Sequence, residues 1–248
     1  MDVSYELIAF VFGTYLIAGL VKGVIGLGLP SIALALIALV MPPAQAAALL
    51  IVPSLVTNVW QMVTGPYLIA LIRRLWLLLF GSVIGIWLGG GILTSANSRY
   101  AALGLGLALI VYGLVGLTGI RFVVSQPAER WWSLPVGLVT GFIAGATGVF
   151  VLPAGPYFQA IELDKDELVQ ALGLSFTVST IALGAILLRD GVLAFGNATA
   201  SLLAVAPALI GMALGQKLRM RASPKLFQRL FFCGMLALGL HQAIRNLL

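Results

Sequence analysis

A single lysine stands within an apolar stretch near the start of the chain. Lys22 belongs to the sequence GLVKGVIGLGLPS, follows the mostly apolar residues 5–21 and precedes Gly26, Gly28 and Pro30. A lysine held inside a bilayer costs about 2.5–3.5 kcal/mol, so its presence there predicts a functional partner of opposite charge. The glycines and the proline predict a break in the helix, and the backbone N–H groups of a helix that starts at such a break attract anions. The stretch therefore indicates a site for a small oxyanion.

The second half of the chain contains a similar stretch, GLVTGFIAGATG, at residues 137–148. The two stretches align glycine on glycine, with Thr140 at the position of Lys22. We predict a second break here, over Ala144–Gly148, and expect both breaks to point N–H groups at the membrane centre. An alternative is that the glycines only allow close helix packing, the role we expect for Gly81, Gly85 and Gly89.

A polar face follows each break. Ser54, Asn58 and Gln61 are spaced i, i+4 and i+7, which places them on one face of a helix. Ser175 and Ser179 are likewise four residues apart in the second half. We predict that these faces line a cavity, although polar side chains in membranes also bond neighbouring helices. The complete predicted anion site consists of Lys22, Gly26, Gly28, Ser31, Ser54, Asn58, Gln61, Gly145, Thr147, Gly148, Ser175 and Ser179.

Few residues are suited to other chemistry. The chain has one cysteine, Cys233, and one histidine, His241, and its eight acidic residues fall at segment ends or in loops. We therefore predict no catalytic residue, no metal site, no disulfide and no cofactor. The absence of a phosphate-binding loop also argues against direct use of ATP. An anion exchanger, a uniporter, or a carrier whose coupling ion is held by backbone oxygens fits this composition.

The elements that must position these residues are membrane helices. The 248 residues are 61% hydrophobic and only 9% charged, with a mean hydropathy of +1.10, whereas soluble domains are about 25% charged. The apolar runs lack the two-residue alternation of a β-barrel. Asp2 and Glu6 replace the basic start of a signal peptide, so we expect the first segment to remain in the membrane. The net charge is +6, and the basic residues lie in short loops between the apolar runs. There they set the orientation of the helices in the membrane, so the charge does not indicate nucleic-acid binding.

Ten apolar segments are predicted, of which Ile32–Met41 and Val149–Ile161 are too short to cross a bilayer. The others are Tyr5–Leu27, Ala44–Val63, Leu68–Leu93, Tyr100–Ile120, Trp132–Ala144, Glu167–Leu188, Ala198–Gly215 and Lys225–Ile244. We predict an all-α polytopic fold of two repeats, 1–124 and 125–248, each a broken hairpin plus three transmembrane helices. Duplicated transporters bind substrate at the repeat interface.

Basic residues predict the orientation. If each hairpin returns to its starting side, ten of the basic residues share one side, which the positive-inside rule makes cytoplasmic. The repeats are then inverted and both termini are extracytoplasmic. If the short segments were loops, the repeats would be parallel and the basic residues would be divided, which the rule disfavours. The ten are Arg73, Arg74, Arg121, Arg130, Lys165, Lys217, Arg219, Arg221, Lys225 and Arg229.

The stretches GLVKGVIGLGLP, MPPAQAAALLIVPSLVTN and GLVTGFIAGATGVFVLP resemble the sulfite exporter TauE/SafE family, also called the TSUP transporters. The resemblance covers essentially the whole chain, although AGATGVF has fewer glycines than the family's usual run. It implies a bacterial inner-membrane carrier of sulfur-containing anions such as sulfite, sulfoacetate, other organosulfonates or thiosulfate. A sulfonate has three acceptor oxygens and needs several donors, which Lys22, the breaks and the polar faces would supply.

These observations favour a secondary transporter, and an exporter in particular, that works by alternating access in the lipid bilayer. A passive anion channel is the main alternative, and an intramembrane enzyme is a weaker one because it would need a nucleophile and a base side by side. The oligomeric state, monomer or homo-oligomer, and the coupling ion are not determined by the residues.

Overall fold

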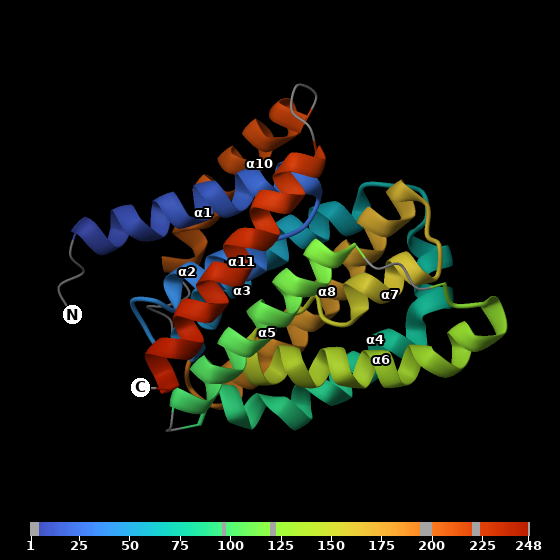
Figure 1. Cartoon of the computed structure of the whole chain (residues 1–248), viewed down its shortest axis with the longest axis horizontal. Coiled ribbons are helices and arrows are strands. Elements are labelled where there is room, and N and C mark those ends of the chain that lie inside the picture. Colours follow the sequence, from blue (N-terminus) through green and yellow to red (C-terminus); the bar gives the residue numbers. More distant parts are fainter. Residues whose placement is uncertain (1–4, 96–97, 120–122, 194–199, 220–223, 248) are drawn as a thin grey trace.

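The computed structural model describes residues 5–95, 98–119, 123–193, 200–219 and 224–247, and all of their regular structure is helical (Figure 1). The predicted all-α fold is therefore confirmed. The helices are α1 (Tyr5–Ile25), α2 (Leu29–Ile37), α3 (Pro43–Val63), α4 (Leu68–Leu93), α5 (Ser98–Thr118), α6 (Gln126–Thr147), α7 (Ala154–Ala160), α8 (Lys165–Arg189), α10 (Val205–Arg219) and α11 (Pro224–Leu247).

Seven helical stretches of the described chain are long and apolar enough to cross a membrane, namely α1, α3, α4, α5, α8, α11 and residues 200–219, which include α10. The α1 helix, with 21 residues, is about 31 Å long, which matches the hydrocarbon thickness of a bilayer. The chain is a multi-pass membrane protein. Two short helices, α2 and α7, complete the two predicted hairpins after α1 and α6, and α2 is buried along nearly all of its length.

The first break lies between α1 and α2. Gly26 and Gly28 adopt φ values of +81° and +105°, a left-handed backbone that favours glycine. The α2 helix then begins at Leu29, three residues earlier than predicted, because Pro30 fits the first turn of a helix.

The second break also differs in detail from its prediction. The α6 helix begins at Gln126 instead of Trp132, because its first turn is polar and carries a proline that fits a helix start. It continues to Thr147 and is capped by Gly148 at φ +78°. The short α7 helix covers only Ala154–Ala160 of the predicted segment.

Contacts between the helices define their directions in the first half. Lys22 bonds Asn58. Gly26, four residues later and just past the end of α1, contacts Gln61, which lies about one turn further along α3. The α1 and α3 helices are therefore parallel, and α2 returns the chain between them. The α3 helix is antiparallel to α8, because Ser54 bonds Thr180 whereas Gln61 contacts Gly173, which is nearer the start of α8.

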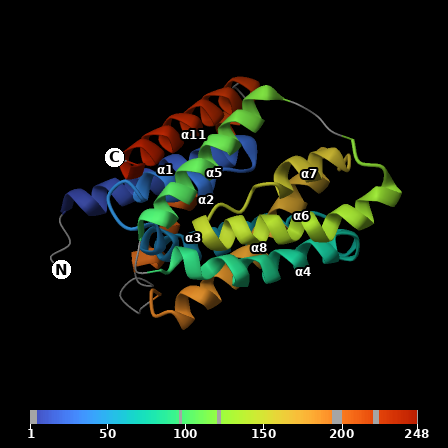
Figure 2. The same ribbon diagram turned by 60° about the horizontal axis from the view of Figure 1, so that its bottom comes forward.

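In the second half, α6 and α8 are both parallel to α4. Gly81 and Gly85 of α4 pack on Leu134 and Leu138 of α6. Along the α4–α8 contact, Gly90 packs on Ile186 and the Thr94 hydroxyl donates to Asp190. Because α8 is antiparallel to α3, and α6 is parallel to α8, the α6 and α8 helices run in the direction opposite to α1 and α3. Figure 2 shows α4 beside α6, and α5 beside α11.

Glycines allow the closest of these contacts. A Cβ on Gly85 would lie 2.2 Å from the Leu138 carbonyl oxygen, and one on Gly89 would lie 2.3 Å from that of Phe142. The packing role predicted for Gly81, Gly85 and Gly89 is confirmed. The glycines of the two repeated stretches do the same, since Gly19 meets Ala208 of α10 and Gly137 meets Leu78 of α4. Small residues of this kind are the usual means of bringing membrane helices together.

The basic residues gather at the end of the bundle where α3 ends and α4, α6 and α8 begin, which we call the basic end. Because α10 runs parallel to α1, its last turn also lies there. The opposite end carries only Arg99, Arg189 and Arg245 of the described basic residues. Arg121 and Arg221 lie outside the described residues. The described members at the basic end are Arg73, Arg74, Arg130, Lys165, Lys217, Arg219, Lys225 and Arg229.

Candidate anion-binding site

Lys22, in the last turn of α1, is the centre of a buried polar network. Its side chain is 3% exposed. The ammonium group donates to the Thr57 hydroxyl at 3.2 Å and to the side-chain oxygen of Asn58. Within the described chain no carboxylate pairs with it, since the salt bridges found there are Arg74–Glu129 and Arg189–Asp190. Among the described residues, the polar partners of the Lys22 ammonium group are therefore neutral oxygen atoms.

The network continues from α1 through α3 to α8. The Asn58 amide donates to the Ser54 hydroxyl at 2.9 Å, and Ser54 shares a 3.2 Å hydrogen bond with Thr180. Thr57 was not among the predicted site residues, although it lies three residues after Ser54 and so belongs to the same helix face. Its hydroxyl also donates to the Pro53 carbonyl at 2.8 Å. These bonds fix the two acceptors that Lys22 uses.

Pro53 explains how α3 remains continuous beside this site. A proline removes a backbone N–H and leaves the carbonyl four residues earlier without its helical donor. The Ser201 hydroxyl donates to that carbonyl, of Leu49, at 2.7 Å, and accepts from the Val52 N–H at 3.2 Å. A side chain from the second half thus satisfies the backbone of the first, as a membrane interior requires.

Two glutamines join α3 to α8 at the basic end. The Gln61 amide donates to the Gly26 carbonyl at 3.1 Å and to that of Val169 at 2.7 Å. The Gln170 amide donates to the carbonyls of Met62 and Gly65, at 2.8 and 3.0 Å, and its oxygen accepts from the Tyr67 N–H. Gln170 was missed from sequence, because it lies in the first turns of α8 and has no counterpart in the repeated stretches.

The tips of the two hairpins contact residues near the ends of neighbouring helices. Gly26 contacts Gln61, two residues before the end of α3. Beside the second hairpin, Gly145 packs on Ile86 and Gly90, which lie in the last two turns of α4. Each tip therefore lies near an end of the neighbouring long helix.

The family model of the sulfite exporter TauE/SafE proteins matches residues 11–241, which include both hairpins and the whole Lys22 network. The chain belongs to the sulfite exporter TauE/SafE family. No curated protein and no solved structure matches the chain significantly. The resemblance seen in the sequence is confirmed, and this TauE/SafE chain is a member of a family of membrane transporters.

In this TauE/SafE chain the second break has different contacts from the first. The Thr147 hydroxyl donates to the Ile143 carbonyl at 2.7 Å and accepts from the Val149 N–H, so its bonds stay within the helix end. Gly148 faces Leu34 of α2. Thr140, at the position equivalent to Lys22, accepts a hydrogen bond from the first N–H of α7, that of Ala154, at 3.1 Å. In the second hairpin Thr140 thus caps the short helix α7, whereas the equivalent residue of the first hairpin is the cationic Lys22.

The remaining predicted residues are buried but do not bond Lys22. Ser31 lies in the first turn of α2, and Gly28 faces Phe231 of α11. Ser175 and Ser179 have buried hydroxyl groups without a hydrogen-bond partner among the described residues. They lie roughly 200–240° around α8 from Gly173, which contacts α3, so they face away from the Lys22 network.

No cluster of three His, Cys, Asp or Glu side chains that could hold a metal ion is found within the described ranges. The chemistry available at the TauE/SafE site is therefore that of one ammonium group, hydroxyl groups and amides. Such a set is chemically suited to binding an anion by charge and by hydrogen bonds.

Proposed function

We propose that the protein is a secondary transporter of the bacterial inner membrane that exports small sulfur-containing anions, such as sulfite or sulfoacetate, and binds them at Lys22. The observation that supports this most is the burial of an ammonium group among neutral oxygens. A buried charge without a counter-charge is strongly unfavourable. An arriving anion would supply that counter-charge.

The neighbours of Lys22 suit an oxyanion with several acceptor oxygens. The hydroxyl groups of Thr57 and Ser54 can rotate to donate, and the Asn58 amide carries donor hydrogens as well. An anion would replace the Asn58 oxygen as the partner of Lys22, and these groups would then turn toward it. Ser31, Ser175 and Ser179 supply further buried hydroxyls for a path across the protein.

Alternating access is proposed to arise from two inverted repeats, residues 1–124 and 125–248. The opposite directions of the two hairpins support this arrangement. The α3 and α8 helices meet at the junction of the halves, and the Ser54–Thr180 bond crosses it. Rocking one half against the other would separate Gln61 from Val169 and Gln170 from Met62, which hold the basic end closed.

The positive-inside rule places the basic end in the cytoplasm and both termini outside. Thr57, the α3 partner of Lys22, lies six residues, or about 9 Å along the axis, before the end of α3. The proposed site is therefore nearer the cytoplasmic surface and is covered there by the two glutamines.

Counterflow in proteoliposomes tests the proposal. Labelled sulfite, sulfoacetate, taurine and sulfate are each supplied outside vesicles loaded with the unlabelled anion. We expect saturable exchange of sulfite or a sulfonate, its loss in Lys22→Gln, and partial retention in Lys22→Arg. Lys217→Gln, an exposed lysine of the basic end, is the matched control and should exchange normally. Wild-type exchange by Lys22→Gln would overturn the site, and flux without counterflow would indicate a channel.

A further inference from the structure

A second basic site lies at the surface, between the first turns of α4 and α6 at the basic end. It is an open pocket of about 400 Å³. Four side chains come from each helix: Arg73, Arg74, Trp76 and Leu77 from α4, and Gln126, Glu129, Arg130 and Ser133 from α6. None of these residues belongs to the Lys22 network.

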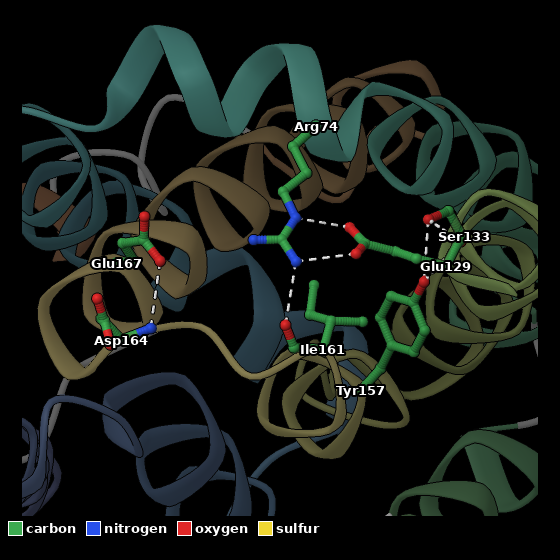
Figure 3. A network of polar contacts seen from close by, with 7 residues as sticks. All are labelled: Arg74, Glu129, Ser133, Tyr157, Ile161, Asp164 and Glu167. Carbon is green, nitrogen blue, oxygen red and sulfur yellow. Dashed lines mark hydrogen bonds and ion pairs between the residues drawn. The ribbon is translucent and has the colours of Figure 1, made fainter. Parts of the chain in front are cut away.

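The inner wall of the pocket is held rigid by a paired glutamate (Figure 3). Arg74 donates to both carboxylate oxygens of Glu129, at 2.7 and 2.8 Å, and to the Ile161 carbonyl at 3.0 Å. The backbone carbonyl of Glu129 accepts from the hydroxyl groups of Tyr157 and Ser133. A two-point Arg–carboxylate pair has a fixed geometry. It also cancels the only acidic charge among the lining residues.

Two cations of the pocket are left uncompensated. Arg73 and Arg130 are exposed, and neither side chain makes a hydrogen bond or an ion pair with any described residue. Arg73 comes from α4 and Arg130 from α6, so each helix contributes one of the two charges. The pocket therefore has two positive charges in excess, together with the Gln126 amide and the Ser133 hydroxyl as neutral polar groups.

Tryptophans place this pocket at the level of lipid headgroups. Trp76 lines it, and Trp131 and Trp132 follow Arg130 directly on α6. All three are more than half exposed. Tryptophan is enriched at the membrane–water interface, where its ring lies among the headgroups. A pocket with both arginine and exposed tryptophan at this depth opens toward lipid rather than toward bulk water alone.

We infer that this pocket binds the phosphodiester headgroup of an anionic phospholipid. Arg73 and Arg130 bind the phosphate oxygens, and Trp76 and Leu77 contact the glycerol and the upper acyl chains. Basic pockets between membrane helices on the cytoplasmic side recognise anionic headgroups in this way. The α4 helix packs on α8, which forms the junction with α3. A lipid bound to α4 would therefore also affect the position of α8 at that junction. The inference does not depend on the transported substrate.

Lipid quenching of a single tryptophan tests the site. A variant that keeps Trp76, with the other four tryptophans replaced by phenylalanine, is reconstituted with phosphatidylglycerol or phosphatidylcholine brominated near the glycerol end of the acyl chains. We expect half-maximal quenching at a lower mole fraction of brominated phosphatidylglycerol than of brominated phosphatidylcholine. The difference should be about fivefold for each of the two pocket arginines. Arg73→Gln combined with Arg130→Gln should remove this preference. The matched control, Lys217→Gln with Arg219→Gln, removes equal charge from the same end outside the pocket.

Equal quenching by the two lipids in the starting protein would overturn the inference. So would loss of the preference in the Lys217/Arg219 control, because the effect would then be surface potential alone. Displacement by millimolar glycerol phosphate at constant ionic strength would identify a site for a soluble phosphate instead of a lipid. Native mass spectrometry repeats the comparison without the tryptophan replacements, on the wild-type chain and the two double variants. We expect the wild-type chain and the Lys217/Arg219 control to retain phosphatidylglycerol, and the Arg73→Gln/Arg130→Gln variant to lose it.

Discussion

The Gln61 side chain donates a hydrogen bond of 3.1 Å to the backbone carbonyl of Gly26, at the tip of the first hairpin. The same amide donates to Val169 of α8 at 2.7 Å. One side chain of α3 thus satisfies two backbone carbonyls, one from each half of the chain. Because Gly26 is four residues after Lys22, this bond also fixes the position of the lysine relative to α3.

Replacing Gln61 by leucine should destabilise the protein by about 1–3 kcal/mol. Each buried hydrogen bond in a membrane protein contributes about 0.6 kcal/mol and up to about 1.7 kcal/mol, and two are lost here. Thermal unfolding in detergent measures the change. Gln242→Leu is the control, since the Gln242 side-chain oxygen is buried without a partner in the described chain, and its loss should be nearly neutral. Equal effects of the two substitutions would contradict the role of Gln61.

The Asn58→Asp variant should lose anion transport and keep its fold. It places a carboxylate where the Asn58 oxygen accepts from Lys22, and a charge-assisted bond is stronger than the neutral one it replaces. The lysine then has a permanent counter-charge and no longer attracts the substrate. We expect counterflow to fall by about tenfold or more, equivalent to ~1.4 kcal/mol. The unfolding temperature should be unchanged or higher. Normal transport by a stable Asn58→Asp protein would show that the charge of Lys22 does not bind the anion.

Gly19→Ala and Gly13→Ala should differ sharply, although both substitutions lie in α1. A Cβ on Gly19 would lie 2.2 Å from the Ala208 carbonyl oxygen of α10, whereas one on Gly13 would have no atom within 4 Å. Overpacking of this kind costs about 1–3 kcal/mol, while alanine stabilises a helix by roughly 1 kcal/mol relative to glycine. Unfolding in detergent compares the two variants. If Gly13→Ala destabilised as much as Gly19→Ala, the contact between α1 and α10 would be wrong.

Much of the fold follows from the order of apolar and basic residues. The long segments are predicted by length and hydropathy, and the breaks by Gly26, Gly28 and Gly148, because few other residues adopt their backbone angles. The exact helix bounds beside the breaks could not be predicted. The polar first turn of α6 resembles a loop in sequence, so the predicted segment began at Trp132 instead of Gln126.

The candidate site was predicted in part. The spacing of Ser54, Asn58 and Gln61 correctly places them on one buried face, but spacing alone does not indicate which neighbouring helix that face meets. For this reason Ser175 and Ser179, which also share a face, were expected beside the anion and instead point away from α3. Contacts between residues far apart in sequence, such as Gln170 with Met62, have no local signal.

Cysteine labelling should place positions 73 and 217 on one side of the membrane and position 247 on the other. Arg73 lies at the start of α4 and Lys217 near the end of α10, and both are at the basic end because α10 is parallel to α1 and α3. Position 247 ends α11, which starts at the basic end and runs antiparallel to α5. Each cysteine is introduced singly into a Cys233→Ser background, because the native thiol is exposed. A membrane-impermeant maleimide added to intact cells should label position 247 only, whereas labelling of 73 and 217 requires broken cells. Opposite accessibility of 73 and 217 would reject the inverted repeats, and labelling of both in intact cells would reverse the proposed orientation.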